Sequence, residues 1–129
     1  MTKAKLNKNA QKWVKALRSG KYKQAAHSLA TYDDSGKTIG HCCLGVACEL
    51  ALKAKAIEWY DGNQGGLPHD VREWLGLSGP MGDFDTPVRE KGHGRIVATD
   101  LTDLNDGLRC SFKQIARFIE SKPKGLFVD

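Results

Sequence analysis

The chain has 129 residues, of which 40% are apolar and 27% are charged, and its formal net charge is +5. This length and composition are typical of one globular domain with its own core, and they exclude a disordered chain. The longest apolar run, Cys42 to Cys48, is too short to cross a bilayer, so we expect no membrane partner. Four cysteines with no secretory signal ahead of them indicate reduced thiols, and we expect a cytoplasmic protein.

The first predicted element is a helix over residues 9–19. Asn9 is its predicted N-cap, and Gly20 supplies a left-handed residue at its C-terminal end. Apolar residues recur at helical spacing, namely at Ala10, Trp13, Val14 and Leu17. Residues 1–8, which precede the predicted helix, are expected to form a flexible N-terminal arm.

A β-hairpin and a buried helix are predicted next. Residues 21–32 fit either a short helix or, toward their end, a strand. A turn signal over 33–36 followed by an extended segment over 37–42 favours a hairpin. Residues 43–55 carry apolar side chains on two faces, which predicts a helix that is buried nearly all round. The alternating segment 56–60 is predicted to be a short strand.

The third quarter of the chain contains a helix and an irregular segment. Pro68 stands at a natural first-turn position for a helix that ends at Leu75. The glycine-rich segment 76–95 is less regular, and Phe84 with Val88 indicates a strand or an ordered loop there.

Two further helices are predicted near the C-terminus. Thr99 is the expected N-cap of a short helix that residues 105–107 end, and Ser111 with Gln114 forms a capping box that opens the last helix. Residues 122–129 are predicted to be a short tail. The whole chain is therefore predicted to be a single domain, 1–129, of helix-dominated α+β class with a small antiparallel sheet or hairpin.

Four sequence blocks, in this order, resemble a family of small uncharacterised proteins of tailed bacteriophages and prophages. The blocks are residues 9–24, residues 42–48, Leu67-Pro68 leading to residues 74–77, and residues 101–106 with 111–116. The resemblance implies a phage accessory protein in the cytoplasm of a bacterial host. Small phage proteins of this sort often bind a host protein, nucleic acid or signalling nucleotide and so weaken host defence. Such a role for this chain is inferred by analogy alone. The resemblance implies no catalytic residues.

The segment from His41 to Cys48 is the first candidate for chemistry. Cys42 and Cys43 fall at a predicted helix N-terminus, where unsatisfied N–H groups lower a thiol pKa. His93, ahead of a possible strand, could supply the base of a Cys/His hydrolase. The alternative interpretation is that the cysteines are small, buried apolar residues, as free cysteines commonly are.

The same cysteines and a neighbouring histidine could in principle hold a metal ion. The candidate ligands are His41, Cys42, Cys43, Cys48 and Cys110. Structural zinc uses ligand pairs two to four residues apart on a knuckle, and this spacing into a helix is poor for it. We therefore expect no metal and no cofactor.

Basic residues near the N-terminus are the second candidate. The first 32 residues contain eight basic and no acidic side chains, whereas the other 97 carry a net charge of −3. This asymmetry favours an anionic partner, although a solvated lysine face would look the same. Cations neutralise phosphate, an aromatic ring stacks on a base and an amide reads its edge. The candidate ligand-binding residues are Lys12, Lys15, Arg18, Lys21, Tyr22, Lys23 and Gln24.

These observations favour a non-enzymatic binding protein. The expected partner is a nucleotide-like host anion or a host protein, held by sequestration and with a role in counter-defence. The first alternative is a sequence-independent nucleic-acid-binding protein, because a basic segment gives salt-dependent affinity without base readout. The second is the Cys/His hydrolase. The sequence leaves the oligomeric state open, and a homodimer is compatible with it.

Overall fold

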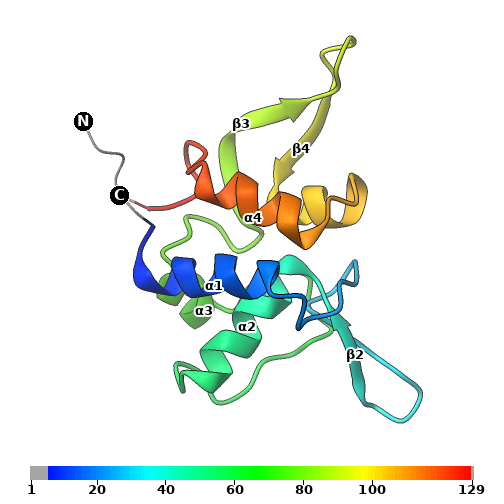
Figure 1. Cartoon of the computed structure of the whole chain (residues 1–129), viewed down its shortest axis with the longest axis vertical. Coiled ribbons are helices and arrows are strands. Elements are labelled where there is room, and N and C mark those ends of the chain that lie inside the picture. The colour runs from blue at the N-terminus through cyan, green and yellow to red at the C-terminus, as the bar shows by residue number, and fades with distance from the viewer. Residues whose placement is uncertain (1–5, 129) are drawn as a thin grey trace.

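Helices and two antiparallel strand pairs make up the computed structural model, which describes residues 6–128 (Figure 1). In chain order the elements are α1 (Lys8–Arg18), β1 (Ala30–Tyr32), β2 (Thr38–His41), α2 (Cys43–Lys53), α3 (His69–Leu75), β3 (Asp83–Arg89), β4 (Ile96–Asp100), the π-helical turn η1 (Asp103–Gly107) and α4 (Phe112–Glu120). The predicted α+β class and single domain are confirmed. The sheets are small: β1 pairs only with β2, and β3 only with β4, within the described chain.

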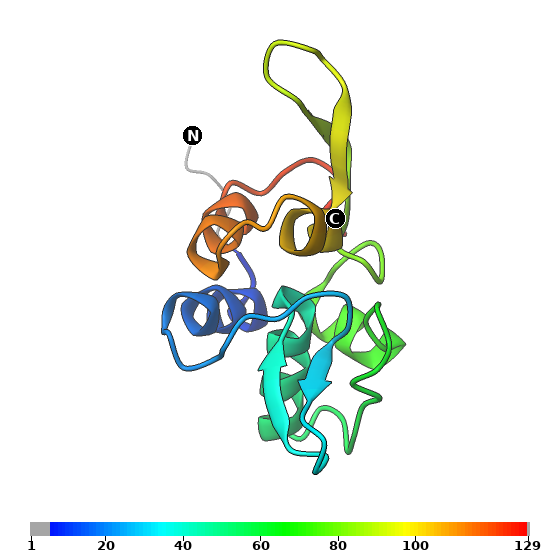
Figure 2. The same ribbon diagram turned by 90° about the vertical axis from the view of Figure 1, so that its right-hand side faces the viewer.

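Helix α1 lies between α4 and α2, as Figures 1 and 2 both show. Its apolar face is buried, and the indole Nε1 of Trp13 donates a hydrogen bond to the carbonyl oxygen of Cys43 at 2.9 Å. This bond satisfies the polar atom of a fully buried tryptophan and fixes the start of α2 against the middle of α1. The lysines of α1 remain on its outer face.

Helix α2 has more buried residues than any other helix of the described chain. It is buried from Cys43 to Cys48, as its two apolar faces predict. Gly45 permits this position, because a Cβ atom there would overlap the carbonyl oxygen of Leu29. The backbone just ahead of β1 therefore lies directly against the helix.

The two strand pairs occupy different positions. β1 and β2 form the predicted hairpin, and the Asp33 carboxylate fixes its turn by accepting hydrogen bonds from the backbone N–H groups of Ser35 and Lys37, both at 2.9 Å. The β3–β4 hairpin extends away from the helices, and residues 91–95 at its tip are exposed (Figure 1). Of the strand or ordered loop expected around Phe84 and Val88, the structure shows the strand, β3.

Both ends of the described chain are held more firmly than the sequence predicts. Residues 1–5 of the expected arm lie outside the described residues, but Asn7, not Asn9, caps α1, and its amide also donates to the carbonyl oxygen of Leu75 at 2.9 Å. In the expected tail, Leu126 is fully buried, and Phe127 forms a β-bridge with Leu77. Long-range contacts of this kind leave no periodicity in the sequence.

Other local predictions need correction. Residues 56–60 form no strand, because the loop that follows them bonds to the backbone at β1 and no strand lies alongside them. Of the two alternatives for residues 21–32, the helix is absent over 21–29 and the strand is present as β1. Pro68 is the N-cap of α3 and not its first residue. Thr99 belongs to β4, and Asp100 caps the following turn by accepting from the N–H of Asp103 at 2.8 Å.

Candidate functional site

A surface hollow between α1 and the end of α2 gathers four lysines. Its volume is about 230 Å³. It is lined by Lys12, Lys15, Ala16, Ser19, Lys21, Tyr22, Leu50 and Lys53, and we call it the lysine hollow. All four lysines are exposed, and no acidic side chain is part of the lining. Their charges therefore add without internal neutralisation, which makes the hollow a site of positive potential.

Helical spacing and one tight turn bring the lysines together. Lys12 and Lys15 are three residues apart on α1 and so lie on the same face. The chain reverses at Gly20, whose φ of +78° is easily adopted only without a side chain, and this returns Lys21 toward α1. Lys53 comes from the last turn of α2, thirty-one residues after Tyr22.

Tyr22 forms one wall of the lysine hollow and is fixed by two neighbours. Lys53 Nζ donates a hydrogen bond to the Tyr22 hydroxyl oxygen at 3.0 Å, and this bond raises the pKa of Lys53, which keeps its charge. The Tyr22 ring packs edge-on against the imidazole of His41, with ring centroids 5.8 Å apart. Tyr22 is thus held in place beside the lysines.

Three of the predicted ligand-binding residues do not line the lysine hollow. Arg18 forms an ion pair with Glu120 of α4 and lines a different depression. The side-chain amide of Gln24 donates to Asn105 Oδ1 at 2.9 Å and to the Cys110 carbonyl oxygen at 2.7 Å. Lys23 is exposed, and its carbonyl oxygen accepts from the N–H of His41 at 2.9 Å. Gln24 in particular is engaged in holding the fold together.

Sequence reasoning missed Lys53 and Leu50. Both lie on α2, which the composition indicates as a core helix, and nothing local shows that its exposed C-terminal turn approaches Tyr22. Only the packing of α1 against α2 brings these residues to the lysine hollow.

The family described as "Domain of unknown function (DUF8296)" matches residues 6–123. The chain belongs to this family. The match covers most of the chain and includes both helices that form the lysine hollow. No curated protein sequence and no solved structure matches the chain.

The cysteines at the start of α2 are buried in this DUF8296 domain, and the predicted lowering of their pKa is wrong. Burial raises the pKa of Cys42, which outweighs the lowering by the backbone N–H groups at the helix start, and raises the pKa of Cys43 well above its ordinary value. His93 lies at the exposed tip of the β3–β4 hairpin, in a depression lined with Glu90 and Arg95 and with no thiol. This geometry does not support the hydrolase alternative.

Metal sites and membrane-spanning helices are both absent from residues 6–128. Within residues 6–128, no group of three or more histidine, cysteine or acidic side chains has the arrangement of a metal site. The cysteines from Cys42 to Cys110 are all free thiols. None of the helices in the same range combines the length and the apolar character that crossing a bilayer needs.

We expect His41 to make the stability of the domain depend on pH. Burial lowers the pKa of its imidazole below the ordinary 6.5, and the Glu49 carboxylate, 3.6 Å from Nε2, only partly opposes this. The unfolded chain therefore binds a proton more readily than the folded one, so stability present above pH 6.5 is lost as the pH falls through the window below it. We expect chemical denaturation to show a falling free energy of unfolding between about pH 7.5 and about pH 5.5.

A pair of variants separates His41 from the other titrating groups. His41→Gln should flatten the pH dependence, since the buried imidazole no longer titrates. The matched change at His69, which is exposed and pairs with Glu73, should leave the dependence as in the unaltered protein. Equal pH dependence in all three proteins would show that His41 is not responsible.

Proposed function

We propose that this domain binds and sequesters a phosphate-bearing, nucleotide-like anion in the lysine hollow. One observation carries the proposal: four lysines from three separate segments line one hollow that contains no carboxylate. Lysine ammonium groups are point charges suited to phosphate, and several around one hollow can neutralise more than one phosphate oxygen. The hollow is open to solvent, so the lysines remain hydrated until a ligand enters.

The uncharged part of the lysine hollow suits the rest of a nucleotide. Tyr22 and Leu50 provide an aromatic ring and an apolar side chain beside the lysines, and a base can stack or pack there. The lining contains no thiol, no imidazole and no carboxylate that could act as nucleophile or general base. Affinity is therefore the property that we expect of this arrangement.

The four sequence blocks point to the biological setting of this binding. Their resemblance to proteins of tailed phages and prophages supports an accessory protein that acts in the host cytoplasm. Sequestration of a host signalling nucleotide there would remove it from a defence pathway. A host protein with a phosphate-like acidic surface is the other partner that the lysine hollow would accept.

The test is a titration of the intact protein with a fluorescent ATP analogue carrying a methylanthraniloyl group. We expect the double variant Lys15→Gln/Lys53→Gln to bind at least about tenfold more weakly, since the loss of two charge-assisted contacts removes more than 1.4 kcal/mol. The control is Lys113→Gln/Lys124→Gln, which removes the same charge at two exposed lysines outside the hollow. An equal loss in both double variants would contradict the proposed site.

A second titration distinguishes the nucleic-acid alternative. A single-stranded 20-nucleotide DNA should bind weakly if the lysine hollow accommodates one nucleotide. Tighter binding to this DNA than to the ATP analogue, with an affinity that falls steeply with salt, would favour the alternative and contradict nucleotide sequestration.

A further inference from the structure

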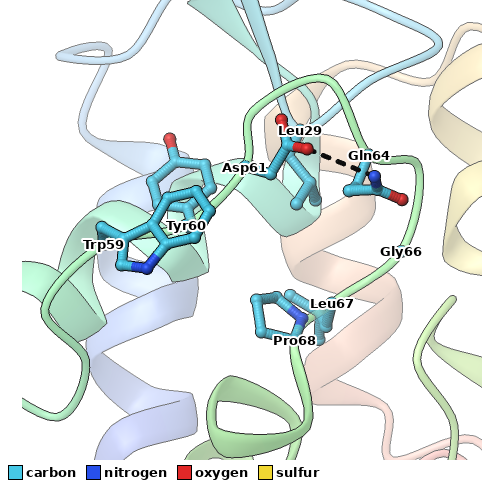
Figure 3. A pocket seen from close by; sticks show the side chains of 8 residues that line it. All are labelled: Leu29, Trp59, Tyr60, Asp61, Gln64, Gly66, Leu67 and Pro68. Carbon is cyan, nitrogen blue, oxygen red and sulfur yellow. Dashed lines mark hydrogen bonds between the residues drawn. The ribbon is translucent and has the colours of Figure 1, made fainter.

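A second hollow, unrelated to the lysines, is built around an exposed tryptophan. Its volume is about 420 Å³, and its lining residues are Leu29, Trp59, Tyr60, Asp61, Gln64, Gly66, Leu67 and Pro68 (Figure 3). The Trp59 side chain is 73% exposed, although an indole ring is among the most costly groups to leave in water. Trp59 and Tyr60 form one side of this aromatic hollow, with Asp61 and Gln64 across from them and Pro68 below.

Backbone hydrogen bonds hold the aromatic hollow in shape. The Leu29 N–H donates to the Gln64 carbonyl oxygen, and the Ala30 N–H donates to the Gly62 carbonyl oxygen, each at 2.8 Å. The Leu67 N–H donates to the Pro80 carbonyl oxygen, also at 2.8 Å. Any Cβ atom at Gly62 would collide with the hydroxyl of Tyr32, so the loop lies tightly against β1. A loop fixed in this way loses little further entropy when a ligand binds.

The polar groups of the aromatic hollow favour positive charge. Asp61 carries the only charge in its lining, which contains no lysine, arginine or histidine. The Asp61 carboxylate is held by hydrogen bonds from the Asn63 N–H at 3.0 Å and from the Gln64 amide at 3.3 Å, and each oxygen keeps a free lone pair.

The aromatic rings add to this preference. The Tyr60 hydroxyl donates to Glu49 Oε2 at 2.7 Å, and burial, together with that carboxylate, raises the pKa of Tyr60, which therefore stays neutral. A hydroxyl that donates to a carboxylate leaves the ring rich in electrons. Cations are attracted to the faces of such rings and to indole most strongly.

We propose that the aromatic hollow binds an organic cation, a guanidinium or alkylammonium group, between the Trp59 and Tyr60 rings and the Asp61 carboxylate. The site is independent of the lysine hollow and takes a ligand of opposite charge. The same chemistry is offered by a free small amine and by an arginine or lysine side chain of a partner protein.

The experiment is a titration followed by backbone amide NMR of the ¹⁵N-labelled protein. N-acetylarginine amide should shift the amide signals of Gly65 and Gly66 saturably, whereas the citrulline analogue, which has the same shape without the charge, should not. Asp61→Asn should weaken binding at least fivefold, and Trp59→Leu should abolish it without unfolding, because Trp59 is exposed. Asp34→Asn, at an exposed acid in the β1–β2 turn, is the matched control and should bind as the unaltered protein does.

Titrations with two further ligands identify the source of the cation. Tighter binding of a pentapeptide with a central arginine than of N-acetylarginine amide would indicate a partner side chain. Binding of choline at least as tight as that of N-acetylarginine amide would indicate a free alkylammonium compound. Equal shifts with the arginine and citrulline compounds would overturn the proposal. So would an affinity that falls as much in Asp34→Asn as in Asp61→Asn, or amide shifts located elsewhere in the domain.

Discussion

Replacing Gly45 with alanine is expected to destabilise the domain by about 3 kcal/mol, because the added methyl group has no space. Alanine is the better helix former by about 1 kcal/mol, so helix propensity alone predicts the opposite sign. The new Cβ would overlap the carbonyl oxygen of Leu29, which is backbone and cannot turn aside as a side chain can. Either α2 or the segment leading into β1 must move, and that disturbs a well-packed core. Chemical denaturation measures the loss.

Gly107→Ala is the matched control for this prediction. Gly107 closes η1, and a Cβ atom there has nothing within 4 Å. Its replacement should change the free energy of unfolding by less than about 1 kcal/mol, with stabilisation the expected sign. If Gly45→Ala were as stable as Gly107→Ala, the close approach of α2 to Leu29 would be refuted.

Replacing Asn105 with leucine should lower the free energy of unfolding by about 3 kcal/mol, for a different reason. Asn105 is buried, and its oxygen accepts from the N–H of Cys43 at 3.2 Å and from the Gln24 amide at 2.9 Å. Its nitrogen donates to the Ala25 carbonyl oxygen at 2.8 Å. Leucine fills a similar volume but leaves the Cys43 N–H and the Ala25 carbonyl without this partner. Each buried polar group that loses its partner lowers the stability of the fold by about 1–3 kcal/mol.

Asn63→Leu provides the comparison for that variant. Asn63 is exposed, so its replacement by leucine should change the free energy of unfolding by no more than about 0.5 kcal/mol. Hydrogen exchange adds a local measurement: the Cys43 amide should lose protection in Asn105→Leu before the domain unfolds. Unchanged protection of that amide, with unchanged stability, would show that Asn105 does not hold α2 in place.

Gln24 and Asn105 show how the fold uses residues that resemble ligand-binding groups. From the sequence, Gln24 is a candidate for reading the edge of a base, and residues 105–107 mark the end of a helix. In the structure, the Gln24 amide and the Asn105 side chain bond to each other and join η1 to the segment ahead of β1. A polar side chain near a basic cluster therefore has two possible uses, and only its partners distinguish them.

The local features of this domain are determined by the sequence. Helix α1, the β1–β2 turn, α2 and the capping box of α4 are all recognisable from the spacing of apolar residues and from short capping motifs, which act within a few residues. Likewise, the concentration of lysine before residue 24 is visible in the sequence, and the anionic partner that it favours stays a prediction.

The tertiary structure alone decided which of these residues lie together. Lys53 reaches the lysine hollow from thirty-one residues beyond Tyr22, Arg18 is drawn to Glu120, and burial overrides the effect of the helix N-terminus on the thiols. Trp59, in a segment whose alternation predicts a strand, instead stands exposed at the aromatic hollow. Backbone propensity acts locally along the chain, whereas ion pairing, desolvation and the shape of a hollow depend on segments that meet only when the core has packed.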